Sequence, residues 1–173
     1  MGLHDFTLAD VYRRNAALFP AQPAFAFDGA AVSHGDYLAR IERLAAGLQH
    51  SGVQRGDRVA ILSQNCPEMV DLIGAVALVG AILLPVNYRL NADEIGFVLG
   101  DGAPKLLIVS EEYRALVQDL LPGLGSVEKS YVIGDASGPF TGFCRSPLGR
   151  AIQAVDVAAG RRLRHHSHRP GRR

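Results

Sequence analysis

One dense group of metal-binding side chains stands out in this chain. His165, His166 and His168 lie close together near the C-terminus, and imidazole is a ligand that suits Zn and Ni. Arginines surround the three histidines, and the segment has too few apolar residues to build a core around them. We therefore interpret the cluster as a place for adventitious metal binding and expect no built metal site.

Four other side chains could take part in chemistry, but each has a simpler structural explanation. Cys66 lies at an expected helix start, where a thiol pKa can fall, yet no histidine is adjacent to it and packing is favoured. His34 lies just inside another expected helix and is interpreted as a capping or surface residue. Asp57 and Arg58 precede a buried strand, where polar residues commonly form local hydrogen bonds. None of the four is predicted to be catalytic.

Helical and strand patterns alternate through the first 140 residues. A tight hairpin is expected around Asp28-Gly29, whose residues adopt positive φ readily. Strands separated by helices imply crossovers within a parallel sheet, so the sequence predicts an α/β fold with a parallel sheet flanked by helices and a small β-hairpin. The expected helices cover 7–20, 33–52, a segment that starts at 65–68, 92–99 and 113–121, and the expected strands cover 58–62, 82–86, 106–109 and 131–133.

The charge of the chain divides near residue 140. Residues 1–140 hold 10 Lys and Arg against 16 Asp and Glu, a balance of −6, whereas residues 141–173 hold 8 Arg and one acidic residue, a balance of +7. We expect a folded domain over 1–140 and a disordered Arg/His-rich tail over 141–173, with one short helical stretch at 148–159.

Two explanations of the tail remain open. A shift of reading frame near Phe143 and Cys144 would account for the sudden change of composition. Alternatively, the arginines form an arm that neutralises nucleic-acid phosphates. No aromatic residue follows Phe143 to stack on bases, so a nucleic-acid partner is not our expectation.

Cysteine content and hydropathy indicate the expected compartment. Two cysteines, Cys66 and Cys144, are too few to suggest a disulfide framework, which favours a reduced, cytoplasmic chain. The N-terminus has no pattern typical of a signal peptide. The uncharged and largely apolar stretch 72–86 is shorter than the ~18 residues of a membrane span.

Two segments, 52–65 and 80–90, carry a family resemblance when taken with the order of the elements. The second reads Gly80-Ala-Ile-Leu-Leu-Pro-Val-Asn-Tyr-Arg-Leu90. From residue 7 to about 140 the chain resembles the N-terminal portion of the large domain in AMP-forming acyl-CoA synthetases, the adenylate-forming ligases. The resemblance implies a reaction in which ATP and a carboxylic or fatty acid give an acyl-adenylate, from which coenzyme A then displaces AMP. Mg²⁺ would accompany the ATP.

The motifs that bind ATP in that family are missing from this sequence. It has no Ser/Thr/Gly-rich run ending in Lys-Gly, no Tyr-Gly-x-Thr-Glu and no Thr-Gly-Asp, and the nearest glycine cluster, 123–126, lacks a lysine. Since positioning of reactants can be worth ~7–11 kcal/mol of barrier, we expect no adenylation by this chain alone and no cofactor of its own.

The resemblance implies one site residue, Arg89. In some relatives the Asn-x-Arg-Leu turn lies near the phosphates of coenzyme A, and the alternative is a surface arginine at a turn. A further alternative is a scaffold that docks, through an exposed apolar face of its sheet, onto a separately encoded remainder.

Overall fold

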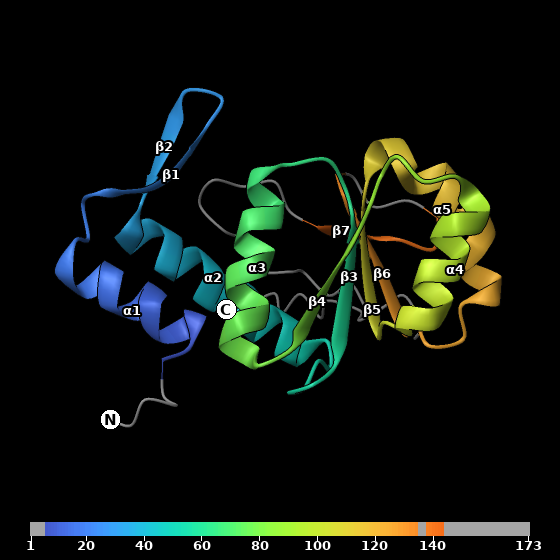
Figure 1. Cartoon of the computed structure of the whole chain (residues 1–173), viewed down its shortest axis with the longest axis horizontal. Coiled ribbons are helices and arrows are strands. Elements are labelled where there is room, and N and C mark those ends of the chain that lie inside the picture. The colour runs from blue at the N-terminus through green and yellow to red at the C-terminus, as the bar shows by residue number, and fades with distance from the viewer. Residues whose placement is uncertain (1–5, 135–137, 144–173) are drawn as a thin grey trace, which may run out of the picture.

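Helices enclose a central parallel sheet, and a helix and a hairpin extend one end of the molecule (Figure 1). The computed structural model describes residues 6–134 and 138–143. The helices are α1 (Leu8–Leu18), α2 (His34–His50), α3 (Pro67–Val79), α4 (Ala92–Gly102) and α5 (Arg114–Leu120), with short 3-10 turns η1 (Glu111–Tyr113) and η2 (Leu121–Gly123) on either side of α5. The strands are β1 (Pro23–Phe27), β2 (Ala30–Ser33), β3 (Arg58–Leu62), β4 (Ile82–Val86), β5 (Leu106–Ser110), β6 (Lys129–Ile133) and β7 (Thr141–Phe143).

The five strands of the central sheet follow the order β4-β3-β5-β6-β7, and every neighbouring pair is parallel. From β3 the chain runs to β4 on one side and then crosses to β5 on the other side. The direction of winding therefore reverses between β3 and β5. In doubly wound sheets such a reversal opens a crevice at the carboxyl ends of the strands, where ligands bind. The expected parallel α/β fold is confirmed.

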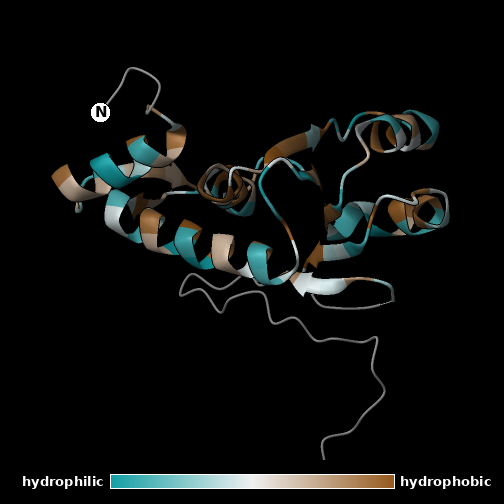
Figure 2. Ribbon diagram, turned by 90° about the horizontal axis from the view of Figure 1, so that it is seen from below, coloured by the Kyte–Doolittle hydropathy of each residue, from teal (hydrophilic) through white to brown (hydrophobic). Residues whose placement is uncertain are grey.

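The two faces of the sheet are covered by different helices. One core cluster joins α2 and α3 to one face, with Leu48, Leu72 and Ile108 at its centre. The other joins α4 and α5 to the opposite face and includes Leu99 and Val109. Strand β5 is buried along its whole length, as expected for a central parallel strand covered on both sides. Figure 2 shows hydrophilic and hydrophobic residues interspersed along α2, the amphipathic helix that the sequence predicts.

The N-terminal layer forms as its sequence predicts. Thr7 and Asp10 make a capping box at the start of α1, because each side chain accepts a hydrogen bond from the other residue's backbone N–H. In the β1–β2 hairpin, Asp28 and Gly29 both have positive φ, 50° and 78°, which is typical of a type I′ turn. The ring of Tyr37 on α2 meets those of Tyr12 and Phe25 edge-on, with both centroid separations 5.4 Å.

Several elements differ from the sequence-based expectation. Helix α3, whose start was expected at 65–68, has Cys66 as its N-cap with no side-chain hydrogen bond and Pro67 at its first turn. Helix α4 continues to Gly102 and ends at Ala103 with φ 42°. The expected helix at 113–121 is α5 with a 3-10 turn at each end. Strand β7 lies at 141–143, where no strand was expected.

Two further sequence-based expectations concern a membrane span and the residues after 143. Among the described residues, no helix combines the length and the apolar character needed to cross a membrane. The possible helix at 148–159 and the histidines at 165, 166 and 168 lie outside the described residues.

Candidate functional site

The loops at the carboxyl ends of β3, β4 and β5 bring polar and aromatic side chains to one edge of the sheet. Ser63 and Gln64 follow β3, the segment 87–90 follows β4, and Ser110 ends β5 just before Tyr113. These positions border the reversal of winding between β3 and β5, which makes this edge the candidate site. We call this group of loops the carboxyl edge.

Arg89 projects from the β4 loop in a defined turn. The Asn87 side chain accepts a hydrogen bond from the backbone N–H of Arg89 at 3.0 Å, and Leu90 N–H donates to the Asn87 carbonyl at 3.2 Å. The Arg89 guanidinium lies over the ring of Tyr88, with its carbon 5.5 Å from the ring centroid. Arg89 is exposed. The turn therefore presents a positive charge to the solvent at this edge.

Two further residues connect Tyr88 to the neighbouring loops. The ring of Tyr113 lies beside that of Tyr88, with centroids 6.2 Å apart and planes inclined by 36°. The side-chain amide of Gln64 donates to the Tyr113 hydroxyl at 3.4 Å, a long and therefore weak hydrogen bond. Both tyrosines are partly buried against the core cluster that includes α4 and α5. Sequence analysis missed Tyr88, Tyr113 and Gln64, although each lies just after an expected strand.

Cys66 does not have the environment of a reactive thiol. Its sulfur lies 3.3 Å from the hydroxyl of Ser63, and burial raises the pKa of the Cys66 thiol above its usual value. A lowered pKa at this helix start, the alternative considered above, is therefore wrong. The packing interpretation fits, because Cys66 contacts the core cluster that includes α2 and α3.

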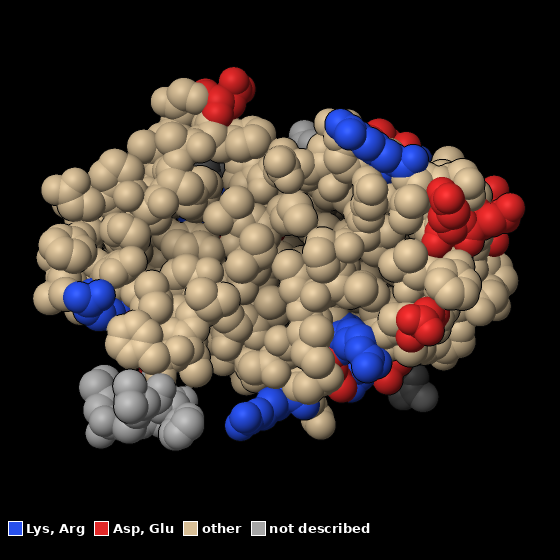
Figure 3. All heavy atoms as spheres, in the orientation of Figure 1, with Lys and Arg blue, Asp and Glu red and all other residues tan. Residues whose placement is uncertain are grey.

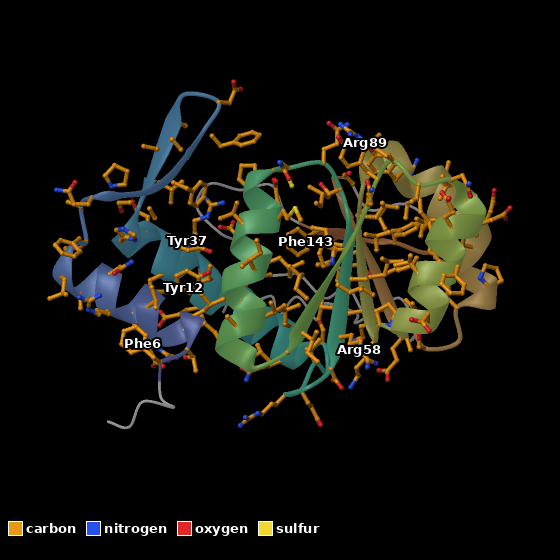
Figure 4. All side chains as sticks on the ribbon, viewed as in Figure 1. Phe6, Tyr12, Tyr37, Arg58, Arg89 and Phe143 are labelled. Carbon is orange, nitrogen blue, oxygen red and sulfur yellow. The ribbon has the colours of Figure 1, made fainter. Side chains whose placement is uncertain are left out.

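Asp57 and Arg58 lie at the opposite end of the sheet from Arg89, as Figure 4 shows for the two arginines. Asp57 accepts hydrogen bonds from the backbone N–H of Gln54 at 2.8 Å and from the Lys105 ammonium at 3.0 Å. These bonds hold the pKa of the Asp57 carboxyl below its usual value, with the Gln54 bond as the larger cause. Lys105 also donates to the Gly52 carbonyl at 2.8 Å. Asp57 and Lys105 thus connect the turn before β3 to the residue that precedes β5. This is the structural role that the sequence predicts for Asp57.

The remaining histidine candidate also has a structural place. His34 is the first residue of α2, where the side chain of the preceding Ser33 accepts a hydrogen bond from the Asp36 N–H at 3.1 Å. The cap is thus Ser33, and His34 contributes through its backbone N–H, which donates to the Gln22 carbonyl. In the described part of the chain, no three His, Cys, Asp or Glu side chains group as a metal site would require.

The surface charge is unevenly distributed. In Figure 3, acidic side chains gather over the end of the molecule that carries α4 and α5, while basic atoms occupy the position that Figure 4 labels Arg89. Arg114 pairs with Glu111 at 3.1 Å near the start of α5. Arg89 has no ion pair among the described residues. Its charge is therefore available to an anionic ligand.

Comparisons with known proteins assign this α/β domain to a family. A model of the AMP-binding enzyme family matches residues 12–145, which is more than half of the chain. The protein belongs to that family. The match runs two residues past the last strand, Thr141–Phe143, so the family-like region extends slightly beyond the boundary expected at 140.

Individual relatives are acid–CoA ligases. The chain is 34% identical over 110 residues to a feruloyl-CoA synthase from Amycolatopsis, covering 64% of this chain and 22% of that protein. It is 32% identical over 130 residues to a 3-oxocholest-4-en-26-oate–CoA ligase from Rhodococcus rhodochrous, covering 75% and 23%. A crystal structure from Rhodopseudomonas palustris, described as a long-chain-fatty-acid CoA ligase, is 69% identical with a TM-score of 0.78, covering 82% of this chain and 36% of that one. The chain thus spans less than a quarter of the length of each of these two curated relatives.

Proposed function

We propose that this chain supplies the leading part of the large domain of an acid–CoA ligase, and that Arg89 at the carboxyl edge is its contribution to binding coenzyme A. The observation that carries the proposal is the Arg89 guanidinium at the carboxyl edge, which is exposed and has no ion pair in the described part of a chain of the AMP-binding enzyme family. The substrate acid of the whole enzyme is a carboxylic or fatty acid, in keeping with the relatives named above.

The chemistry of Arg89 fits the phosphates of coenzyme A. A guanidinium keeps its charge at all physiological pH values and offers donors that match phosphate oxygens. Arg89 is exposed and its guanidinium makes no ion pair among the described residues, so its N–H groups can donate to a phosphate. In the ligase reaction coenzyme A supplies the thiol that displaces AMP from the acyl-adenylate. The proposed role of Arg89 is to bind and orient a phosphate, and it takes no part in bond breaking.

The chain by itself is expected to release no pyrophosphate from ATP and Mg²⁺ with any carboxylic acid. The supporting observation is that the sequence contains none of the family's phosphate-binding motifs, and loss of reactant positioning alone can cost ~7–11 kcal/mol of barrier. A coupled pyrophosphate assay on the purified chain, with ferulate and a long-chain fatty acid as probes, tests this. Turnover that persists after repeated purification would contradict the proposal.

Coenzyme A is expected to bind the chain weakly, and Arg89→Ala is expected to reduce the affinity about tenfold, because the side chain provides a charge-assisted hydrogen bond to phosphate. Titration followed by NMR measures the dissociation constant. Arg58→Ala, which removes an exposed arginine at the other end of the sheet, is the matched control and should have no effect. Equal losses in the two variants would indicate non-specific attraction and overturn the assignment.

A scaffold role remains the second proposal, supported by exposed apolar side chains. Both faces of the central strands are buried in the described part of the chain. Apolar contact with a remainder would therefore involve an outer strand or the outer face of a helix. Ile82 on the outer strand β4 is 49% exposed, and Phe97 on α4 is 74% exposed. If a protein carrying the rest of the large domain binds this chain, Ile82→Lys should weaken the complex. Undiminished association in pull-down and sedimentation measurements would contradict docking at this edge.

A further inference from the structure

An exposed arginine at a loop tip has great rotamer freedom, and fixing it on a ligand costs conformational entropy. A phosphate-binding arginine therefore benefits from contacts that restrict it before the ligand arrives. Arg89 has two such contacts at the carboxyl edge. The Asn87 side chain fixes its backbone through the N–H···Oδ1 bond of 3.0 Å, and the Tyr88 ring lies under its guanidinium at 5.5 Å.

We propose that Tyr88, supported by Tyr113, is a positioning residue that holds the Arg89 guanidinium in its phosphate-binding orientation. The inference rests on the proposed role of Arg89 in binding coenzyme A. A cation within about 6 Å of a ring centroid is attracted to the electron-rich face of the ring. This attraction acts on the charged end of Arg89, whereas the Asn87 bond acts only on its backbone.

The ring of Tyr88 can serve this role because it is itself held in place. It packs against the core cluster that includes α4 and α5, and its neighbour Tyr113, at a centroid separation of 6.2 Å, packs against the same cluster. Tyr113 follows β5, while Tyr88 follows β4, so the support comes from two strands that are not adjacent in the sheet. Gln64, which follows β3, contacts the Tyr113 hydroxyl at 3.4 Å. Residues after three strands therefore form one series of contacts, from Gln64 through Tyr113 to Tyr88, and Tyr88 carries the Arg89 guanidinium.

The tyrosine rings are expected to contribute more to the position of Arg89 than the tyrosine hydroxyls do. The interaction with Arg89 requires an aromatic face at position 88, so Tyr88→Phe should preserve it and Tyr88→Leu should remove it at similar apolar bulk. The bond from Gln64 to Tyr113 is long, so Tyr113→Phe should change little. Tyr113→Leu removes the supporting ring and should have an intermediate effect.

The test uses the full chain and two readouts. In the absence of ligand, the ring current of Tyr88 should displace the Arg89 side-chain NMR resonances, and the displacement should persist in Tyr88→Phe and vanish in Tyr88→Leu. With coenzyme A, Tyr88→Leu should weaken binding about 2- to 5-fold, the range expected for an exposed cation–π contact. Removal of the 3′-phosphate, by use of 3′-dephospho-coenzyme A, shows whether that group or the diphosphate is the one bound.

A double-mutant cycle separates positioning from a general structural effect. In the Arg89→Ala background, Tyr88→Leu should cause no further loss of affinity. A loss that persists there, or Arg89 resonances that are not displaced in the wild type, would overturn the inference. If the wild type does not bind coenzyme A at all, the proposed function fails. The ligand-free spectra then decide the positioning role alone, supported by a displacement that depends on the ring and refuted by its absence.

Discussion

Replacing Gly74 by valine is expected to lower the free energy of unfolding by about 3 kcal/mol, at the upper end of the usual cost of overpacking a core. Gly74 lies on α3 where that helix meets α2. A Cβ atom at this position would come within 2.6 Å of Ile41 Cγ2 and 2.8 Å of the Tyr37 hydroxyl. Ile41 is completely buried, so it has no room to move, and the two helices must separate.

Gly100 on α4 provides the matched control. A Cβ built there meets no atom within 4 Å, so Gly100→Val should change the unfolding free energy by no more than about 0.5 kcal/mol. Urea unfolding followed by circular dichroism measures both variants. Equal midpoints for Gly74→Val and the wild type would show that the α2–α3 contact is looser than the structure indicates.

Local patterns in the sequence were enough to predict most of the fold. The capping box at Thr7, the positive-φ pair Asp28-Gly29 and the apolar segment Ile82–Val86 are each determined by neighbouring residues, so they form where the sequence predicts them. Strand β7 is different. It has only three residues, and it forms by pairing with β6, from Tyr131↔Thr141 to Ile133↔Phe143. A strand this short has little periodicity of its own, and it forms only through its contacts with another segment.

The candidate site was less predictable for the same reason. The family resemblance identified Arg89, but its surroundings come from loops after three different strands. Tyr113 is separated from Tyr88 by a complete helix, and only the sheet order places the two rings together. At Cys66 a local sequence pattern was misleading. Its position at a helix start suggested a lowered pKa, but burial among the side chains around it has the larger effect and raises the pKa.

The Arg40–Asp71 ion pair between α2 and α3 was not found by sequence analysis either. Arg40 Nε donates to Asp71 Oδ2 at 3.0 Å and Nη2 donates to the same oxygen, while the side chains are only 17% and 13% exposed. The other oxygen, Oδ1, is buried and has no hydrogen-bond partner in the described residues. Burial is the larger influence on this carboxyl and raises the pKa of Asp71 despite the favourable contact with Arg40.

Arg40→Met is therefore expected to destabilise the protein by about 3 kcal/mol at neutral pH, because it leaves a largely buried carboxylate without its counter-ion. Arg14→Met, which removes an exposed arginine on α1, is the matched control and should cost no more than about 0.5 kcal/mol. Replacing both partners, in Arg40→Met with Asp71→Leu, should recover most of the loss, because no charge then remains buried.

The dependence on pH separates loss of the ion pair from simple loss of packing. A carboxyl whose pKa is raised by folding binds protons more tightly in the native state, so the free energy of unfolding falls as pH increases from the unfolded value of about 4 to the raised native pKa. Without Arg40 the native pKa of Asp71 should rise further, and the fall should become larger. Unfolding measured at pH 5 and pH 7 should therefore show a smaller difference between Arg40→Met and the wild type at pH 5. A difference that is the same at both values would mean that the methionine variant suffers from altered packing, and that the charge of Asp71 contributes nothing to its instability.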